Sequence, residues 1–303
     1  MNEEINTIHL RIIKEYFPDM LLNNVKQKEG NDHVVYIVNG KVFRFPKKSR
    51  EIVPKRANFL KQLAKVSPIA VPVISIKQDA QTGIWYEVNE YIPGISCSPD
   101  LIKKFSYNDK MEIAKKFGNF LNVLHTFPID EARKLSLDEM NPNDFGEYME
   151  QNAQAYPKFK RLVFPYVSNA EQEWIETLFS EYIVAVKKRP FEIKVTHADM
   201  WLEHIIIDQQ KHTLSGIIDY WGRIADPAND FKAFEYFGRA FVDEVYKHYG
   251  LSVDEGFEKR RLFYTGHDHV FELARQIEQS NAEQIEKQKV LLSAYIESHP
   301  MHA

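Results

Sequence analysis

The stretch that decides the fold is VTHADMWLEHIII (residues 195–207), followed by LSGIID (residues 214–219). Three apolar runs lie within or next to these segments, at residues 193–195, 204–207 and 214–218. Polar residues flank each run, which predicts three short strands. Polar side chains stand at the ends of these strands. We therefore expect those side chains to face a common cleft.

Three of these side chains, Asp199, His204 and Asp219, suit the transfer of a phosphoryl group. For such a reaction a protein mainly positions the nucleophile, holds Mg²⁺ on the phosphate oxygens and neutralises developing charge. Asp199 follows the first strand and is predicted to be the catalytic base, which accepts a proton from an incoming hydroxyl. His204 and Asp219 are predicted to share the metal ion. His197 is expected to brace the loop, because the proton acceptor already stands two residues on.

This segment resembles the His-x-Asp-x-x-x-x-Asn loop of the aminoglycoside phosphotransferase family. His204 stands at the Asn position, which departs from the general pattern but is usual in the branches that look closest, the aminoglycoside 2''-phosphotransferases and next the macrolide 2'-phosphotransferases. The segments IIDY (217–220) and DPANDF (226–231) resemble the family's metal loop and the turn that follows it. The resemblance implies that Asp226 and Asp230 are structural and helix-capping acids. A lone His-x-Asp is common by chance, whereas Asp199, His204, Asp219 and the DPANDF turn in this order are much less so.

The first third of the chain predicts an antiparallel sheet with a turn suited to phosphates. Apolar runs at residues 22–28, 34–38 and 42–45 favour strands, and Asn39-Gly40 is a strong signal for a two-residue hairpin. Between the first two runs, the turn at Gly30, Asn31 and Asp32 can offer backbone N–H groups to a phosphate. We predict that these three residues contact the nucleotide.

The FRFP segment (residues 43–46) resembles the N-terminal lobe of the 2''-phosphotransferases, where a strand ends in a cation followed by Phe-Pro. The resemblance implies that Arg44 grips the α and β phosphates, in place of the Lys of many relatives. Kinase-like folds pair that cation with a Glu on the next helix, but residues 54–63 contain Lys55 and Arg56 and no acid. Glu51 lies too early for the pattern. The partner of Arg44 is therefore left unassigned.

Residues 85–88, WYEV, alternate like a strand, and the chain then leaves through the Pro-Gly turn of NEYIPG, residues 89–94. The resemblance implies that this exit is a hinge. Glu90, Tyr91 and Ile92 are predicted to offer backbone groups to the purine edge of the nucleotide. An ordinary loop between a strand and a helix is the alternative.

Helices follow the hinge. Ser106 or Asn108 caps a predicted helix whose apolar positions recur at helical spacing, namely Ile113, Phe117, Phe120, Leu121 and Leu124. Further helical patterns cover residues 170–188, 255–278 and 281–298. The predicted fold is therefore α+β and bilobal, like a protein kinase. An N-terminal sheet lobe covers residues 1–92, and a larger helical lobe with the catalytic loop, metal loop and acceptor site covers residues 93–303.

Bulk properties suit a cytoplasmic enzyme that acts as a monomer. The 303 residues suffice for two lobes, and the chain has neither a basic and apolar leader nor a long apolar run, so we expect no secretion and no membrane partner. A net charge of −4 argues against a nucleic-acid partner. Cys97 is the single cysteine, which excludes an internal disulfide and a zinc site built on cysteines.

The expected reaction transfers the γ-phosphate of ATP or GTP, with Mg²⁺, to a hydroxyl of a small molecule. An aminoglycoside-type antibiotic is the first expected acceptor, with Trp201 and Glu235 as predicted contacts. Carboxylates suit such a polycation, and those after Asp230 are Glu235, Asp243, Glu244, Asp254, Glu255, Glu258, Asp268 and Glu272.

Three alternatives stay open. Aromatic residues are dense in the same region, which suits a large apolar acceptor and a macrolide 2'-phosphotransferase. A kinase of another small metabolite is possible on the same fold. Arg44 and the missing helix Glu also suit a nucleotide-binding pseudokinase or sensor.

Overall fold

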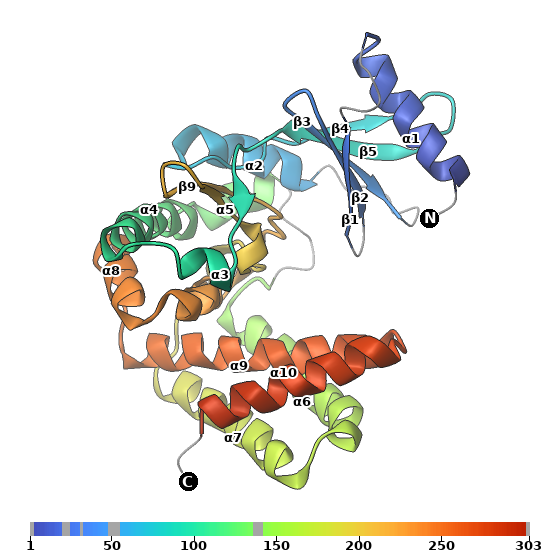
Figure 1. Cartoon of the computed structure of the whole chain (residues 1–303). Coiled ribbons are helices and arrows are strands. Elements are labelled where there is room, and N and C mark those ends of the chain that lie inside the picture. Colours follow the sequence, from blue (N-terminus) through green and yellow to red (C-terminus); the bar gives the residue numbers. More distant parts are fainter. Residues whose placement is uncertain (1–2, 20–24, 31–32, 48–54, 136–141, 301–303) are drawn as a thin grey trace.

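The computed structural model describes residues 3–19, 25–30, 33–47, 55–135 and 142–300. Its N-terminal part contains helices α1 (Glu3–Tyr16) and α2 (Lys55–Val66) and strands β1 (Lys26–Glu29), β2 (His33–Val38), β3 (Lys41–Pro46), β4 (Ser75–Gln78) and β5 (Trp85–Glu90). The strands form one antiparallel sheet in the order β1-β2-β3-β5-β4. Figure 1 shows this sheet and α1 at one end of the molecule, with the long C-terminal helices at the other.

The two faces of this sheet differ because side chains alternate along a strand. Phe43 and Phe45 of β3 are fully buried in a cluster with residues of α1, including Ile12 and Ile13. Arg44, between the two phenylalanines, points to the opposite face. The register is fixed by the predicted hairpin at Asn39-Gly40, whose φ angles of 48° and 74° are the left-handed values that a two-residue turn of this type requires.

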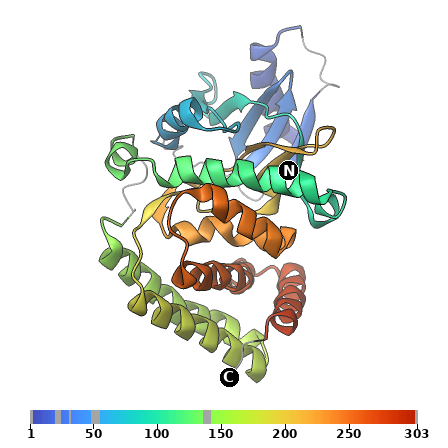
Figure 2. The same ribbon diagram turned by 90° about the vertical axis from the view of Figure 1, so that its left-hand side faces the viewer.

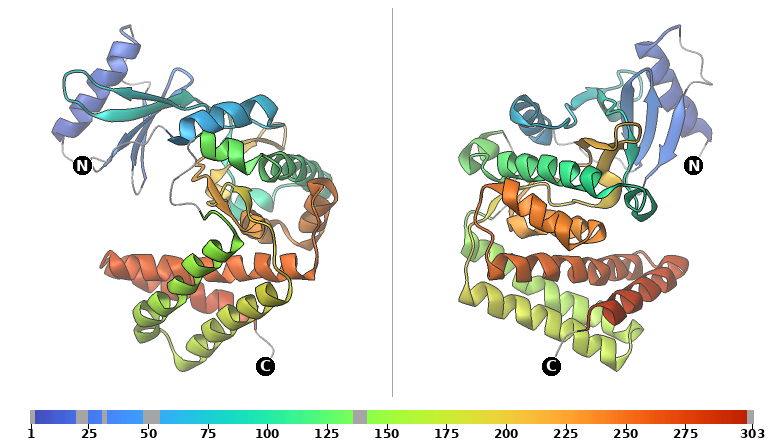
Figure 3. Two further views of the ribbon diagram at one scale, coloured as in Figure 1. Left: turned by 180° about the vertical axis from the view of Figure 1, so that it is seen from behind. Right: turned by 60° about the vertical axis from the view of Figure 1, so that its left-hand side comes forward.

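The C-terminal part is mostly helical. Its helices are α3 (Pro99–Ile102), α4 (Tyr107–His125), α5 (Ile129–Lys134), α6 (Phe145–Val163), η2 (Phe164–Tyr166), α7 (Asn169–Lys188), η3 (Leu202–His204), η4 (Pro227–Phe237), α8 (Arg239–Tyr249), α9 (Glu255–Glu278) and α10 (Ala282–Ser298). Figure 2 shows α4 between α2 and α8. Figure 3 shows the two chain ends far apart, one beside the sheet and the other below α7. In the described part of the chain, no helix has the length and apolarity needed to cross a membrane.

Short strands are inserted among these helices. They are β6 (Ile95–Ser96), β7 (Lys194–Thr196), β8 (Ile205–Asp208), β9 (Thr213–Ile217) and β10 (Arg223–Ala225). β8 and β9 form an antiparallel hairpin with β6 at its edge, and β7 pairs with β10. The hairpin also contacts the segment after α2: a Cβ on Gly216 would lie 2.4 Å from the Ala70 carbonyl oxygen. Only glycine allows this approach, which ties the catalytic hairpin to the N-terminal part.

Helix α4 has the features that its sequence predicts. Ser106 is its N-cap and forms a capping box with Asp109, which satisfies backbone N–H groups at the helix start. The five predicted apolar positions of its stripe are all fully buried, and each contributes about 2 kcal/mol to stability. Gly118 allows close packing on α8, since a Cβ there would lie 2.6 Å from the Val245 carbonyl oxygen.

The predicted α+β order, a sheet lobe followed by a larger helical lobe, is confirmed. The strands expected at residues 193–195, 204–207 and 214–218 are found as β7, β8 and β9. Of the strand expected at residues 22–28, β1 covers the last part, and residues 20–24 lie outside the described ranges. Helices α1 and α6 are additional; α6 contains Pro157 in its interior, which interrupts the usual sequence signal of a helix. The lobe division after residue 92 stays a prediction.

Candidate active site

Asp199 lies in a loop whose backbone is held by a buried carboxylate. Asp230 accepts hydrogen bonds from the backbone N–H groups of His197, at 2.7 Å, and Ala198, at 2.9 Å. Ala198 has a φ of 67°, a left-handed conformation that costs a non-glycine residue about 1 kcal/mol. These two charge-assisted hydrogen bonds offset that cost. The loop therefore takes a defined shape, and the structural role predicted for Asp230 is confirmed.

His197 links the same loop to Ile218, the residue that follows β9. Its Nε2 donates to the Ile218 carbonyl at 3.0 Å, and its Nδ1 accepts from the Asp199 backbone N–H at 3.2 Å. Burial lowers the pKa of His197 to about 4, so the ring is neutral at physiological pH. A neutral ring with one donor and one acceptor matches both contacts. The predicted bracing role of His197 is confirmed.

This buried histidine predicts a loss of stability in acid. Its folded-state pKa of about 4 lies below the ordinary 6.5, so the unfolded chain binds a proton that the folded protein resists. The stabilisation linked to the neutral His197 ring is therefore fully present above pH 6.5 and is lost as the pH falls toward 4. This loss should lower the free energy of unfolding by about 2 kcal/mol between pH 7.5 and pH 5. Urea titrations at both pH values should show a correspondingly smaller pH dependence in His197→Gln; equal pH dependence in the two proteins would contradict the assignment.

His204 turns one ring nitrogen toward Asp219. Its Nδ1 donates to the Asp199 backbone carbonyl at 2.7 Å, which leaves the Nε2 lone pair available. That Nε2 lies 3.5 Å from Asp219 Oδ2. Its Nδ1 also lies 3.6 Å from Asp199 Oδ2, so the three predicted side chains lie together. His204 contacts both carboxylates.

The charges around Asp219 keep its carboxylate ionised. Burial raises its pKa, but the charge of Arg44, the hydrogen bond from Arg44 and the charges of further neighbours such as Arg56 together outweigh burial and hold the pKa at about 2. Arg44 Nη2 lies 2.7 Å from Asp219 Oδ1. Asp219 itself has a φ of 62°, a strained conformation of the kind found at functional sites.

The surroundings of Asp199 raise its pKa, whereas those of Asp219 lower its pKa. Burial raises the pKa of Asp199, and nearby positive charge, including that of Lys232, opposes this effect without cancelling it. The side chain is still 32 % exposed, so an acceptor molecule can reach it. A raised pKa makes Asp199 a better proton acceptor than an ordinary aspartate.

Arg44 also faces a carboxylate that the sequence did not single out. Its Nε lies 3.8 Å from Glu87 Oε2, and Arg56 Nη2 of α2 lies 2.5 Å from Glu87 Oε1. The only sequence signal was Glu87 itself, because a glutamate inside a strand needs a partner when it is buried; the sequence does not indicate which residue that partner is.

The other predicted nucleotide contacts are only partly placed. The Gly30 N–H donates to the His33 carbonyl at 2.9 Å, whereas Asn31 and Asp32 lie outside the described residues. Glu90 forms an ion pair with Lys41. The Tyr91 N–H donates to the Gly40 carbonyl at 2.8 Å and is therefore committed to the sheet. Ile92 is buried. Their nucleotide roles stay predictions.

Comparison with known proteins gives the family. A family model described as "Phosphotransferase enzyme family" matches residues 27–263, more than half of the chain. The chain belongs to the phosphotransferase enzyme family. The phosphotransferase resembles aminoglycoside 2'-phosphotransferase-IIIa in its GDP complex, with 21 % identity and a TM-score of 0.82 over 95 % of this chain and 97 % of that one. A search of curated proteins gave no significant match.

Two further solved structures share this fold. The GDP and kanamycin complex of APH(2")-IIIa has 20 % identity and a TM-score of 0.80, over 96 % of this chain and 99 % of that one. Macrolide 2'-phosphotransferase type I has 20 % identity and a TM-score of 0.70, over 95 % and 97 %. At these identities the likeness shows the fold alone. The phosphotransferase is a small-molecule kinase, and the bilobal kinase-like fold expected from its sequence is confirmed.

Trp201 and Glu235, the predicted acceptor contacts, each lie near a buried cation of the phosphotransferase. Lys232 Nζ lies 2.5 Å from Asp268 Oδ2 and 4.7 Å from the centroid of the Trp201 ring. Both members of this ion pair are almost fully buried. Glu235, the other predicted acceptor contact, lies 2.6 Å from Arg261 Nη1, and the Arg261 side chain is only 2 % exposed. A buried cation therefore neutralises each of the two acids.

The remaining acids considered for a polycationic acceptor are also paired. Each of the eight acids lies within 4.0 Å of a cationic side chain; these partners are Lys232, Arg239, Lys247, Arg189, Lys259, Arg261 and Arg275. Five of the eight acids pair with a residue three or four positions away on the same helix, as the sequence spacing allows. Glu235, Asp254 and Asp268 pair with residues far along the chain, which only the fold reveals.

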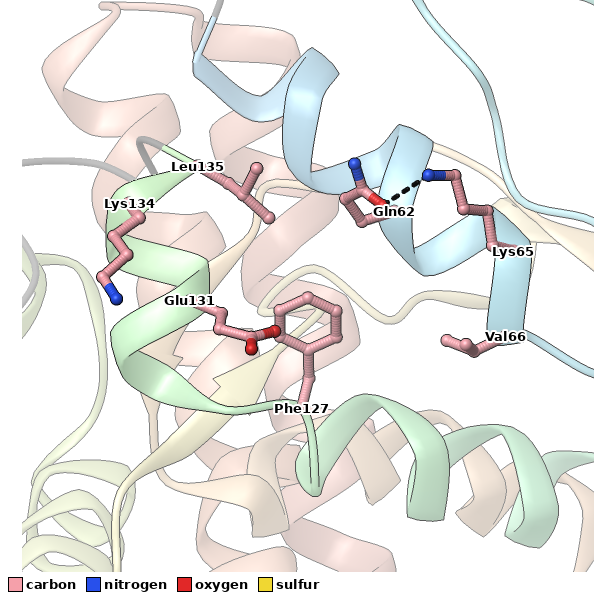
Figure 4. Close-up of a pocket in the computed structure, with 7 residues that line it drawn as sticks. All are labelled: Gln62, Lys65, Val66, Phe127, Glu131, Lys134 and Leu135. Carbon is pink, nitrogen blue, oxygen red and sulfur yellow. Dashed lines mark hydrogen bonds between the residues drawn. The ribbon is translucent and has the colours of Figure 1, made fainter.

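The hollow shown in Figure 4 belongs to a different part of the phosphotransferase. It has a volume of about 380 Å³ and lies between α2 and α5, where Gln62, Val66, Phe127, Glu131 and Leu135 line it together with two lysines. None of the candidate catalytic residues lines it. It is not the site of the proposed chemistry.

Proposed function

We propose that this phosphotransferase transfers the γ-phosphate of ATP or GTP to a hydroxyl of a small molecule, with Asp199 as base. The observation that supports it best is the convergence of four side chains, three from residues 199–219 and one, Arg44, from the distant strand β3. Arg44 contacts Asp219, His204 lies between Asp219 and Asp199, and Asp199 remains accessible. This arrangement provides a cation for phosphate, a pair of metal-binding groups and a proton acceptor within one site.

Asp199 acts on the acceptor. It orients the hydroxyl and takes its proton as the oxygen bonds to phosphorus, while the bond from the γ-phosphorus to the bridging oxygen breaks and the nucleoside diphosphate leaves. The nucleophile is the acceptor's own oxygen, and no covalent phospho-enzyme forms. Arg44 neutralises charge on the phosphates from the other side.

His204 and Asp219 are the residues that would hold Mg²⁺. Magnesium in kinases binds through one or two carboxylates and completes its coordination with phosphate oxygens and water. The ionised Asp219 fits that donor set, and Nε2 of His204 would supply a second ligand. When bound, the ion neutralises charge on the β and γ phosphates.

The neutralised acids bear on the acceptor. An aminoglycoside is a polycation, and a carboxylate already paired with a buried cation binds it weakly, because separating that pair leaves a buried charge unpaired. Asp268 and Glu235 are both held in this way. The second candidate function, phosphorylation of a large and weakly charged acceptor such as a macrolide, is favoured by this observation. An aminoglycoside-type acceptor remains the alternative on this fold.

A panel assay tests the function and the acceptor together. Purified protein with Mg²⁺ and either ATP or GTP is incubated with macrolides and with aminoglycosides, and acceptor-dependent nucleoside diphosphate is measured. We expect turnover with a macrolide to exceed turnover with kanamycin by at least about tenfold, since one lost ion pair is worth about 1 to 3 kcal/mol. Faster turnover of kanamycin would overturn the choice of acceptor.

The same assay separates a kinase from a nucleotide sensor. A sensor binds Mg²⁺ and nucleotide but forms no diphosphate with any acceptor. We expect acceptor-dependent diphosphate that disappears in Asp199→Asn. Nucleotide binding with no turnover across both antibiotic classes and other small hydroxyl metabolites would favour the sensor.

A further inference from the structure

Two arginines meet at one buried carboxylate in the phosphotransferase. Arg44 of β3 and Glu87 of β5 stand directly opposite each other in the sheet. Arg44 Nε lies 3.8 Å from Glu87 Oε2, and Arg56 Nη2 lies 2.5 Å from Glu87 Oε1. Arg44 also extends in the other direction, where its Nη2 lies 2.7 Å from Asp219 Oδ1. Its guanidinium therefore spans two carboxylates.

Glu87 depends on its cationic neighbours because it is buried. The side chain of Glu87 is 3 % exposed, that of Arg44 is 18 % exposed and that of Arg56 is 30 % exposed. A buried carboxylate without a cation is costly, and removing one member of a buried pair leaves an uncompensated charge. Glu87 thus compensates charge on both arginines.

Helix α2 provides a cation here and no acid. Its sequence, KRANFLKQLAKV, contains neither Asp nor Glu. The acid that faces the cation of β3 is instead located on the neighbouring strand β5, and the helix is attached to that acid through Arg56. Compared with the Lys and Glu pair of kinase-like folds, the cation stays on β3, the acid lies on β5 instead of the helix, and the helix carries a second cation.

We propose that Glu87 is the positioning residue for Arg44, and that Arg56 links helix α2 to the same carboxylate. The inference rests on the proposed function, in which Arg44 binds phosphate. Glu87 attracts the Nε edge of the guanidinium from 3.8 Å away, so that the Nη2 edge projects toward Asp219 and the phosphates. Because Arg56 belongs to α2 and pairs with Glu87, it attaches the helix to the carboxylate that faces Arg44. A fixed guanidinium loses less freedom when it binds phosphate, which favours affinity.

The test measures nucleotide affinity by calorimetry with Mg·ATP and Mg·GTP, using the one that binds more tightly. Glu87→Gln keeps the shape of the side chain and removes its charge, and we expect it to weaken binding by about tenfold. Lys41→Gln is the matched control. It removes the cation of the exposed Lys41–Glu90 pair, which joins the same two strands three residues away. We expect no change in affinity there.

A double-mutant cycle separates positioning from a merely structural role. If Glu87 acts through Arg44, Glu87→Gln has no further effect on affinity in an Arg44→Gln background. Effects that multiply would overturn the inference. If Arg44→Gln alone leaves nucleotide affinity unchanged, the proposed phosphate-binding role of Arg44 fails, which is a separate outcome.

A second variant keeps the test decisive if Glu87→Gln does not fold. Glu87→Asp keeps the charge that compensates the two arginines but shortens the side chain by one methylene. We expect a loss of affinity in the same direction, a few-fold in size, with the stability to urea largely kept. Unchanged affinity in this folded variant would also overturn the proposal.

Discussion

Asp199→Asn is expected to abolish acceptor-dependent turnover while nucleotide affinity stays within about twofold of the unaltered protein. The amide has the shape of the carboxylate but cannot accept the proton, and a positioned general base contributes roughly 10² to 10⁴-fold to rate. The loop itself is held by Asp230 and His197 through backbone groups, so its shape does not depend on the Asp199 carboxylate. Steady-state release of nucleoside diphosphate and calorimetric binding of Mg·nucleotide measure the two quantities.

The matched control is Asp208→Asn, the same substitution at the end of β8. Asp208 accepts backbone hydrogen bonds in the β8–β9 turn and contacts none of the proposed catalytic groups. Its turnover should be normal. Full activity in Asp199→Asn would remove Asp199 from its role as base.

Asp219→Ala is expected to weaken nucleotide binding in the presence of Mg²⁺ by on the order of 100-fold, because a metal ligand is lost. Without Mg²⁺, we expect the effect of Asp219→Ala on nucleotide affinity to change sign. Asp219 then repels the phosphates and competes for Arg44, which lies 2.7 Å away. We therefore expect metal-free nucleotide to bind the variant as well as, or better than, the unaltered protein. Calorimetry with and without Mg²⁺ measures both affinities.

The comparison with Arg44→Gln supplies the control for that experiment. Loss of the phosphate-binding cation should weaken binding with and without the metal. An equal loss of affinity in Asp219→Ala under both conditions would contradict a metal-binding role for Asp219 and would point to a general disturbance of the site.

Much of the fold is predictable because local signals agree with the tertiary structure. Asn39-Gly40 adopts the backbone angles that its residue types favour, and Ser106 caps α4 as its sequence indicates. The spacing of Asp199, His204 and Asp219 around two short strands also predicts their convergence, since a hairpin determines which residues become neighbours.

What the sequence does not reveal are contacts between residues far apart in the chain. Glu87 and Arg56 are separated by 31 residues, and no local pattern pairs them. Arg261 is separated from Glu235 by 26 residues and neutralises an acid that the sequence offered to a polycation. Burial decides both cases, because a charge removed from water requires a partner.

The most direct test of the account uses Mn²⁺ in place of Mg²⁺ and detects, by electron spin echo envelope modulation, the nuclei bound to it in the nucleotide complex. The account predicts that one Mn²⁺ ion shows coupling both to phosphorus of the nucleotide and to an imidazole nitrogen, and that His204→Asn removes only the nitrogen coupling. A nitrogen coupling that persists in His204→Asn, or its absence in the unaltered protein, would contradict the proposed site.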